Sequence, residues 1–78
     1  MNIDKLRTIF VEALGIKLEQ VSDELTYNSI PEWDSIGHMT LISELDSQFV
    51  IMLDTDDVLD MSSFAKAKEI LAKYDVEF

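Results

Sequence analysis

The sequence of 78 residues contains no cysteine. This absence excludes both a disulfide framework and a cysteine zinc site, so a chain this short must fold on its apolar residues alone. It also excludes a cysteine nucleophile, and it leaves the chain without a thiol of its own for thioester chemistry. The single histidine, His38, cannot form a metal site by itself.

Glycine and proline are nearly as scarce, since only Gly15, Gly37 and Pro31 occur. Two isolated glycines cannot form the glycine-rich loop that cradles phosphates in nucleotide-binding enzymes. No apolar run approaches the roughly 20 residues of a membrane span, and the N-terminus lacks the basic and apolar segments of a secretory signal. We therefore expect one soluble, cytoplasmic domain over residues 1–78 that does not associate with a membrane.

Positive charge is missing from the middle of the chain. The six bases lie within residues 5–17 and 66–73, whereas sixteen acids bring the net charge to −10. Residues 18–65 contain eleven acids and no base. Such a surface would repel nucleic acid and attract basic protein surfaces. Acidity also serves simply to keep a small domain soluble, and charge alone does not separate these two roles.

The first third of the chain reads as one helix and a long connection. Asn2 is a good N-cap, and Gly15 suits the left-handed residue that ends a helix, so the apolar spacing between them predicts a helix over residues 3–14. Residues 15–34 mix loop formers with apolar side chains. We expect a long connection that is pinned onto the core, with one helical turn near residues 18–21.

The second predicted helix covers residues 36–49 and follows two capping residues, Asp34 and Ser35. Its apolar stripe would face inward and consist of Ile36, Met39, Leu41, Ile42, Leu45 and Phe49. Its outward face would carry Gly37, His38, Thr40, Ser43, Glu44, Asp46 and Ser47.

The remaining residues predict two more helices. Residues 50–53 are apolar but have no second strand to pair with, so we expect a buried connector. Asp54 or Thr55 would cap a short helix over residues 56–60, and a serine at 62–63 would cap the last helix. The inner face of that helix would consist of Phe64, Ala67, Ile70, Leu71 and Tyr74. The fold class is therefore all-α, a small four-helix bundle of three main helices and one short helix.

Few side chains invite catalysis. Ser35 and His38 lie three residues apart on one helix and loosely resemble a nucleophile and its base. A solvated surface histidine is the simpler interpretation, because nothing in the sequence would orient the ring. The aspartates of residues 54–57 resemble the start of a calcium loop, but Leu59 and Ala65 stand where that loop needs glycine and glutamate. We expect neither enzymatic activity nor a metal site.

The tripeptide Asp34-Ser35-Ile36 resembles the Asp-Ser-Leu sequence that opens the second helix of the acyl carrier protein family. The likeness continues through Leu14-Gly15-Ile16-Lys17 and the acidic stretch 54–60 with the capped helix after it, and so covers nearly the whole chain. It implies an acyl-carrier-like bundle. It also implies that a phosphopantetheinyl transferase moves 4′-phosphopantetheine from coenzyme A onto Ser35, between Asp34 and Ile36. The thiol of that arm would carry an acyl or aminoacyl group, which fits the absence of cysteine.

The resemblance also implies where partners bind, namely the outer face of the second helix and the acids beyond it. The candidate partner-binding residues are Gly37, His38, Thr40, Glu44, Asp46, Asp56 and Asp57. The implied partners are the transferase, an acyl- or aminoacyl-loading ligase and downstream transferases with basic surfaces, and we expect a monomer. Gly37, Thr40 and Ser43 stand at outer positions where housekeeping fatty acid carriers more often have acidic or apolar contacts, and His38 and Trp33 also depart from that pattern. These departures favour a dedicated carrier for a specialised pathway, such as polyketide, nonribosomal peptide or cell-surface polysaccharide synthesis.

Two further interpretations stay open. The chain would instead be an acidic helical interaction module without a prosthetic group if Ser35 were only a cap. A cleft for an acyl chain between the second and fourth helices would be lined by Met39, Leu45, Met61 and Phe64, although core packing is the simpler role for them. We expect Trp33 to pack the end of the long connection onto the bundle.

Overall fold

Four α-helices and one 3₁₀ turn make up the computed structural model, which describes all residues from 1 to 78. The elements are α1 (Asn2–Leu14), η1 (Leu18–Gln20), α2 (Ser35–Phe49), α3 (Thr55–Asp60) and α4 (Phe64–Ala72). Three main helices and one short helix were predicted, and the all-α bundle is confirmed. None of these helices combines the length and the apolar character that crossing a lipid bilayer requires.

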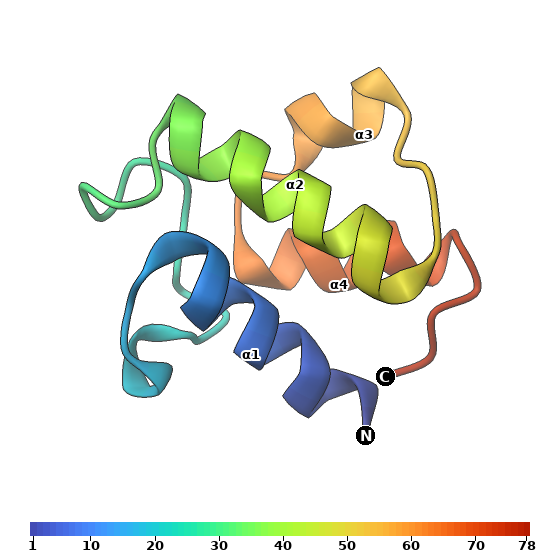
Figure 1. The fold of residues 1–78 in the computed structure, drawn as a ribbon, viewed down its shortest axis with the longest axis horizontal. Coiled ribbons are helices and arrows are strands. Elements are labelled where there is room, and N and C mark those ends of the chain that lie inside the picture. The colour runs from blue at the N-terminus through green and yellow to red at the C-terminus, as the bar shows by residue number, and fades with distance from the viewer.

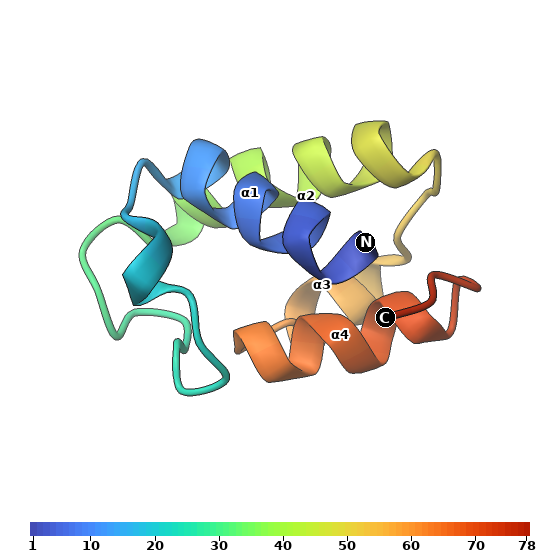
Figure 2. The same ribbon diagram turned by 90° about the horizontal axis from the view of Figure 1, so that it is seen from below.

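The helices pack in two layers around one core. α1 and α2 lie next to each other, α4 runs across the other side of the core, and α3 sits at the edge beside α2 and α4 (Figure 1, Figure 2). The two chain ends lie close together in both views, and the Asn2 side-chain amide donates a hydrogen bond to the Glu77 carbonyl at 2.9 Å. The residues between α1 and α2 wrap the opposite end of the bundle.

Three aromatic rings form the centre of the core. The Phe10 ring meets Trp33 edge to face at 5.4 Å between centroids and meets Phe64 in the same way at 5.0 Å. Trp33 is fully buried, at 0% exposure, although it lies in the connection before α2. The prediction that Trp33 packs the connection onto the bundle is confirmed.

The connection over residues 15–34 is held to the core along its length. Its buried side chains are Ile16, Val21, Leu25 and Trp33. Two backbone hydrogen bonds fix it to the start of α4: the Tyr27 N–H donates to the Ser62 carbonyl at 2.8 Å, and the Phe64 N–H donates to the Leu25 carbonyl at 2.9 Å. A pinned connection with one helical turn was predicted, and η1 supplies that turn.

The helix ends differ from the predicted ones in one place. α1 begins at Asn2 itself, with Met1 in the cap position and no side-chain cap, so the prediction that Asn2 caps this helix is wrong. The Asn2 amide is instead used to join the two chain ends. Gly15 ends α1 with φ 67° as predicted. The cap of α4 is Ser63, whose hydroxyl accepts from the Lys66 N–H at 2.9 Å.

α2 buries a different stripe from the one predicted. Ile36 and Met39 are 76% and 61% exposed, so placing them on the inward face is wrong. The buried residues of this helix are Leu41, Ile42 and Leu45. His38 lies three residues before Leu41 and four before Ile42, and that spacing puts all three on one face. Because this face points into the core, His38 is half-buried.

Candidate functional site

Asp34 and Ser35 have different roles at the start of α2. Asp34 is the N-cap, and its Oδ1 accepts a hydrogen bond from the Gly37 N–H at 2.8 Å. Ser35 is the first helical residue and is exposed. Because the cap is made by Asp34, the Ser35 hydroxyl is left outside it and faces solvent.

Gly37 allows the connection to lie directly against the first turn of α2. A Cβ atom added at this position would stand 2.2 Å from the Glu32 carbonyl oxygen and 3.2 Å from Leu14 Cδ2. No side chain fits such an approach. The expectation that Gly37 is on the outward face is therefore wrong. Its Cα faces the connection, and the lack of a side chain lets the connection pack against α2.

His38 joins three segments of the molecule through its two ring nitrogens. The Trp33 indole Nε1 lies 2.9 Å from His38 Nδ1, and His38 Nε2 lies 2.8 Å from the Val58 carbonyl oxygen in α3. An indole N–H only donates, so Nδ1 must accept, and the proton of the neutral ring is on Nε2, from which it is donated to Val58. The expectation of a solvated surface histidine is wrong. The Tyr27 ring also meets the imidazole edge to face at 5.5 Å.

A pocket of about 340 Å³ opens beside Ser35, between α2 and α3. Its lining residues are Tyr27, Ser35, His38, Met39, Val58, Leu59, Met61 and Ser62. No Asp, Glu, Lys or Arg contributes to this lining. Met39 and Met61 line it as expected, but Leu45 and Phe64 are buried in the core. The cleft expected between the second and fourth helices is therefore found between the second and third.

The mouth of the pocket is surrounded by exposed apolar side chains. Met39 and Leu59 belong to its lining and are largely exposed, and Ile36 follows Ser35 along α2. The Thr40 hydroxyl donates to the Ile36 carbonyl at 3.2 Å and is exposed one turn further on. Ser35 thus stands at the border between an apolar cavity and an apolar outer surface.

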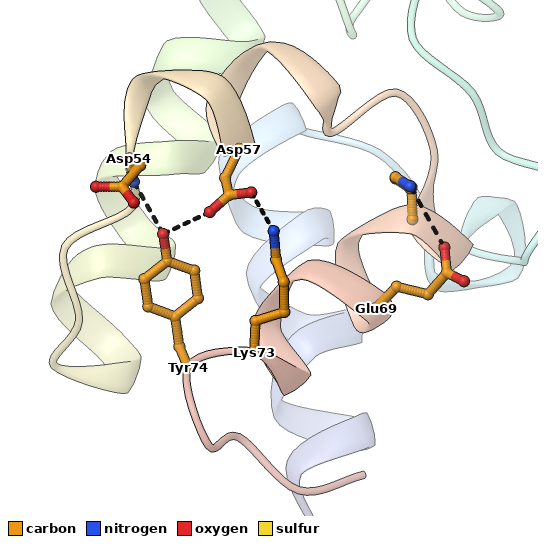
Figure 3. Close-up of polar contacts among 6 residues, drawn as sticks. Asp54, Asp57, Glu69, Lys73 and Tyr74 are labelled. Atoms are coloured by element: carbon orange, nitrogen blue, oxygen red, sulfur yellow. Dashed lines mark hydrogen bonds and ion pairs between the residues drawn. The ribbon is translucent and has the colours of Figure 1, made fainter.

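A polar network attaches α3 to the end of α4 (Figure 3). Asp57 is the single buried charged residue, at 7% exposure. Its Oδ1 lies 2.5 Å from Lys73 Nζ, and its Oδ2 accepts from the Tyr74 hydroxyl at 2.6 Å. The Tyr74 oxygen in turn accepts from the Asp54 N–H at 3.0 Å. Both oxygens of Asp57 are used inside the protein, which corrects the expectation that Asp57 is an outward acid available to a partner.

The network shifts the pKa values of its three side chains in a consistent way. The hydrogen bonds from Lys73 and then Tyr74 hold the pKa of the Asp57 carboxyl below its ordinary value. The hydrogen bond to Asp57 raises the pKa of Lys73 and also raises the pKa of Tyr74. An ionised carboxylate, a charged ammonium and a protonated phenol are the forms that the network stabilises.

The other expected partner-binding acids differ in how accessible they are. Asp46 is half-buried, and its Oδ1 accepts from the Leu53 N–H at 3.1 Å, which fixes the connector after α2. Glu44 is half-buried on α2, whereas Asp56 in α3 is exposed. The exposed acids of this region are Asp54, Asp56 and Asp60 on α3 and its flanks, and Glu32 and Asp34 before α2.

Ser35 and its cap were predicted from the sequence, but the residues that form the wall of the pocket were not. Tyr27, Val58, Leu59 and Ser62 line it and were not among the candidate residues. Tyr27 and Ser62 carry no recognisable motif, because backbone hydrogen bonds between distant segments bring the connection beside the start of α4. For His38 a signal existed in its spacing from the buried Leu41 and Ile42.

The start of α2 fits a phosphate ester on Ser35. The backbone N–H groups of Ser35 and Ile36 have no intramolecular partner, because the Asp34 side chain and carbonyl take those of Gly37 and His38. Free N–H groups and the helix dipole favour an anion at this position. The sequence matches no family model, and it matches no curated protein.

Proposed function

We propose that the protein is a carrier without catalytic activity, which holds an acyl group on a 4′-phosphopantetheine arm attached to Ser35. The observation that carries this proposal is the position of one side chain. The Ser35 hydroxyl is exposed, is released from capping by Asp34, and stands at the mouth of an apolar pocket. An enzyme that modifies Ser35 has open access to it, and cargo attached there has a cavity within reach.

Three groups of this chain would hold the arm at its root. The free N–H groups of Ser35 and Ile36 would attract a phosphate on the Ser35 oxygen, and the positive end of the α2 dipole would add to that attraction. Asp34 keeps the first turn of α2 closed through its bond to Gly37. When bound, the group supplies a thiol that forms a thioester, which a chain without cysteine lacks.

The pocket favours an acyl group over an aminoacyl group as the cargo that is sheltered. Its walls beside Ser35 are formed by Met39, Val58, Leu59 and Met61, and no acid lines it. An ammonium group would lose its hydration there without gaining an ionic partner. Methionine side chains adapt to apolar groups of different shape, which suits cargo that enters and leaves.

The acids on α3 and its flanks are the proposed contact for partner enzymes. Asp54, Asp56 and Asp60 are exposed on α3 and its flanks, and the same helix supplies Val58 and Leu59 to the pocket lining. α2 and α3 contain no lysine or arginine. The partners proposed are a phosphopantetheinyl transferase, a loading ligase and downstream transferases with basic surfaces, which such a field would attract and orient. Asp57 does not take part, because Lys73 and Tyr74 occupy its oxygens.

The proposal is tested by the mass of the intact protein after incubation with coenzyme A, magnesium and a broad-specificity phosphopantetheinyl transferase. We expect one adduct with the mass of a single phosphopantetheinyl group. Ser35→Ala should remain unmodified, and Ser47→Ala, which removes another exposed hydroxyl on α2, should be modified as the wild type is. No adduct on the wild type, or an adduct that persists in Ser35→Ala, overturns the proposal.

A second candidate function is an acidic interaction module that has no prosthetic group. The exposed acids of Asp54, Asp56 and Asp60, which no base of α2 or α3 balances, favour it independently of Ser35. The two functions separate in cells: a module keeps working with Ser35→Ala, whereas a carrier loses all function with that change. Complementation by the variant, expressed at wild-type level, distinguishes them.

A further inference from the structure

We propose that His38 is a proton-sensitive positioning residue, which in its neutral form holds the connection, α2 and α3 together around the pocket and releases Trp33 when it gains a proton. This inference rests on the proposed function only for the nature of the cargo, because the pocket and its latch are properties of the unmodified chain. We call the Trp33–His38–Val58 arrangement the histidine latch.

The histidine latch links three segments through two hydrogen bonds of one side chain. Trp33 belongs to the connection, His38 to α2 and Val58 to α3, and both hydrogen bonds are shorter than 3.0 Å. His38 and Val58 also line the pocket. The imidazole therefore contributes directly to the position of one wall relative to the other.

Only one of the three charge and tautomer states of the ring satisfies both partners. The indole N–H must donate and the Val58 carbonyl must accept, so the ring must accept at Nδ1 and donate at Nε2. A protonated ring donates from both nitrogens. Its bond to Val58 survives, but at Nδ1 two N–H groups then point at each other, and the bond to Trp33 is lost.

The surroundings offer the protonated ring no compensating ion pair. The Tyr27 ring packs edge to face against the imidazole, and the Trp33 ring stacks at 6.1 Å between centroids. The charged residues on these segments are Lys17, Glu19, Asp23, Glu24, Glu32 and Asp34 in the connection, Glu44 and Asp46 in α2, and Asp54, Asp56, Asp57 and Asp60 in α3 and its flanks. None of them forms an ion pair with His38. Asp34 is used by the Gly37 N–H, and Asp57 by Lys73 and Tyr74.

Losing the Trp33 bond has a defined consequence for the pocket. Trp33 is fully buried and fixed by Phe10, so the side chain that must turn away is His38. When the imidazole turns, its hydrogen bond to the Val58 carbonyl either moves that wall of the pocket or breaks. Protonation of the imidazole is therefore expected to loosen the pocket while the rest of the fold persists.

The chain provides natural probes for this test, because it contains one histidine and one tryptophan. The experiment is NMR of the unmodified protein between about pH 8 and pH 5, the range over which histidine changes charge. At the upper end we expect imidazole nitrogen shifts of the Nε2–H tautomer. As the ring titrates, exchange of the indole N–H with water should become faster. This direction is diagnostic, since hydroxide-catalysed exchange of a free indole becomes slower as pH falls.

Methionine methyl groups report on the pocket in the same samples. Met39 and Met61 line it, whereas Met1 and Met52 lie elsewhere and serve as internal controls. The Met39 and Met61 resonances should shift with the midpoint of the imidazole titration, and the other two should not follow it. A titration of all four together would indicate general unfolding and would contradict a local latch.

Two variants separate the latch from ordinary packing. His38→Gln places an amide donor near the position of Nε2, and His38→Asn places an acceptor near that of Nδ1, so each keeps one bond and neither titrates. Both should abolish the acid-induced change at Trp33 and Met61. An indole N–H that behaves alike in wild type and variants, or a wild-type ring in the Nδ1–H tautomer, overturns the inference. Since no arm is present, a failure here is distinct from a failure to modify Ser35.

Discussion

α3 is attached to the bundle on two sides by contacts of opposite character. On the α2 side a neutral imidazole links Trp33 to the Val58 carbonyl. On the α4 side the Asp57 carboxylate binds Lys73 and Tyr74. A helix of six residues without a side-chain cap does not persist by itself in water. α3, which forms one wall of the pocket, is therefore held in place entirely by contacts with its neighbours.

The two attachments respond to pH in different ranges. The pKa of Asp57 is lowered, so its contribution to stability is present above the ordinary aspartate value of about 4 and is lost as pH falls below it. The pKa values of Lys73 and Tyr74 are raised, so their contributions are present below about pH 10 and are lost above that. The α4 attachment is therefore constant across neutral pH, where only a histidine changes charge.

The largest loss of stability is expected from Trp33→Ala, which removes the indole that donates a hydrogen bond to His38. The ring is fully buried against Phe10, and truncating such a residue costs about 3–5 kcal/mol. Trp33→Phe keeps a ring but removes the indole N–H, and should cost less. Urea unfolding measures both. A loss for Trp33→Ala below about 1 kcal/mol would show that the ring does not anchor the connection.

A smaller loss is expected from Gly37→Ala, which forces the connection away from α2. Alanine in an exposed helix gains about 1 kcal/mol over glycine, but here its Cβ would meet the Glu32 carbonyl oxygen at 2.2 Å. We expect a net loss of about 1–3 kcal/mol. Gly15→Asn is the matched control, because Gly15 has open space around it and only its left-handed φ restricts it. A stabilised Gly37→Ala protein would contradict the close approach.

Asp57→Asn should break the α4 attachment and is expected to cost less than Gly37→Ala, because the Lys73 side chain is 60% exposed and the pair is screened by water. The variant should lose the part of the fall in melting temperature below about pH 4 that we expect from Asp57 in the wild type. Its histidine titration should be unchanged. Thermal unfolding across pH measures the first effect, and a wild-type acid profile retained by the variant would contradict it.

The smallest effects are expected at the start of α2, where two adjacent residues should behave differently. Asp34→Ala removes the cap and should cost about 1 kcal/mol. Ser35→Ala should change stability by no more than about 0.5 kcal/mol, since its hydroxyl makes no cap. Guanidinium unfolding of the two variants compares them. Equal losses would show that Ser35 shares the capping role and would weaken its assignment as a free attachment point.

The helices were predictable because their apolar residues repeat within one element. Residues 3–14 and 36–49 were predicted, and α1 and α2 cover Asn2–Leu14 and Ser35–Phe49. The facing of α2 was less well predicted. Ile36 and Met39 were placed inward on their apolar character, and His38 outward on its polarity, although spacing from Leu41 and Ile42 favours the reverse.

The rest of the site depends on contacts between distant residues, which no local pattern encodes. Val58 lies twenty residues from His38, and Lys73 lies sixteen from Asp57. Neither pairing leaves a periodic signal, because each joins two different elements. The Glu32 carbonyl oxygen occupies the space that a Cβ atom at Gly37 would need, and it belongs to a connection without regular structure. The proposed attachment residue was singled out from a short motif, whereas the pocket and the histidine latch could be found only in the fold.

The central claim is that Ser35 carries the arm and that the cargo attached to it enters the pocket. The most direct measurement is NMR of the protein modified at Ser35 and loaded with a short acyl group, compared with the same protein carrying the free thiol. We expect loading to shift the methyl resonances of Met39 and Met61 and to leave those of Met1 and Met52 in place. Identical methyl spectra for the two forms, or a chain that accepts no arm at Ser35, would contradict it.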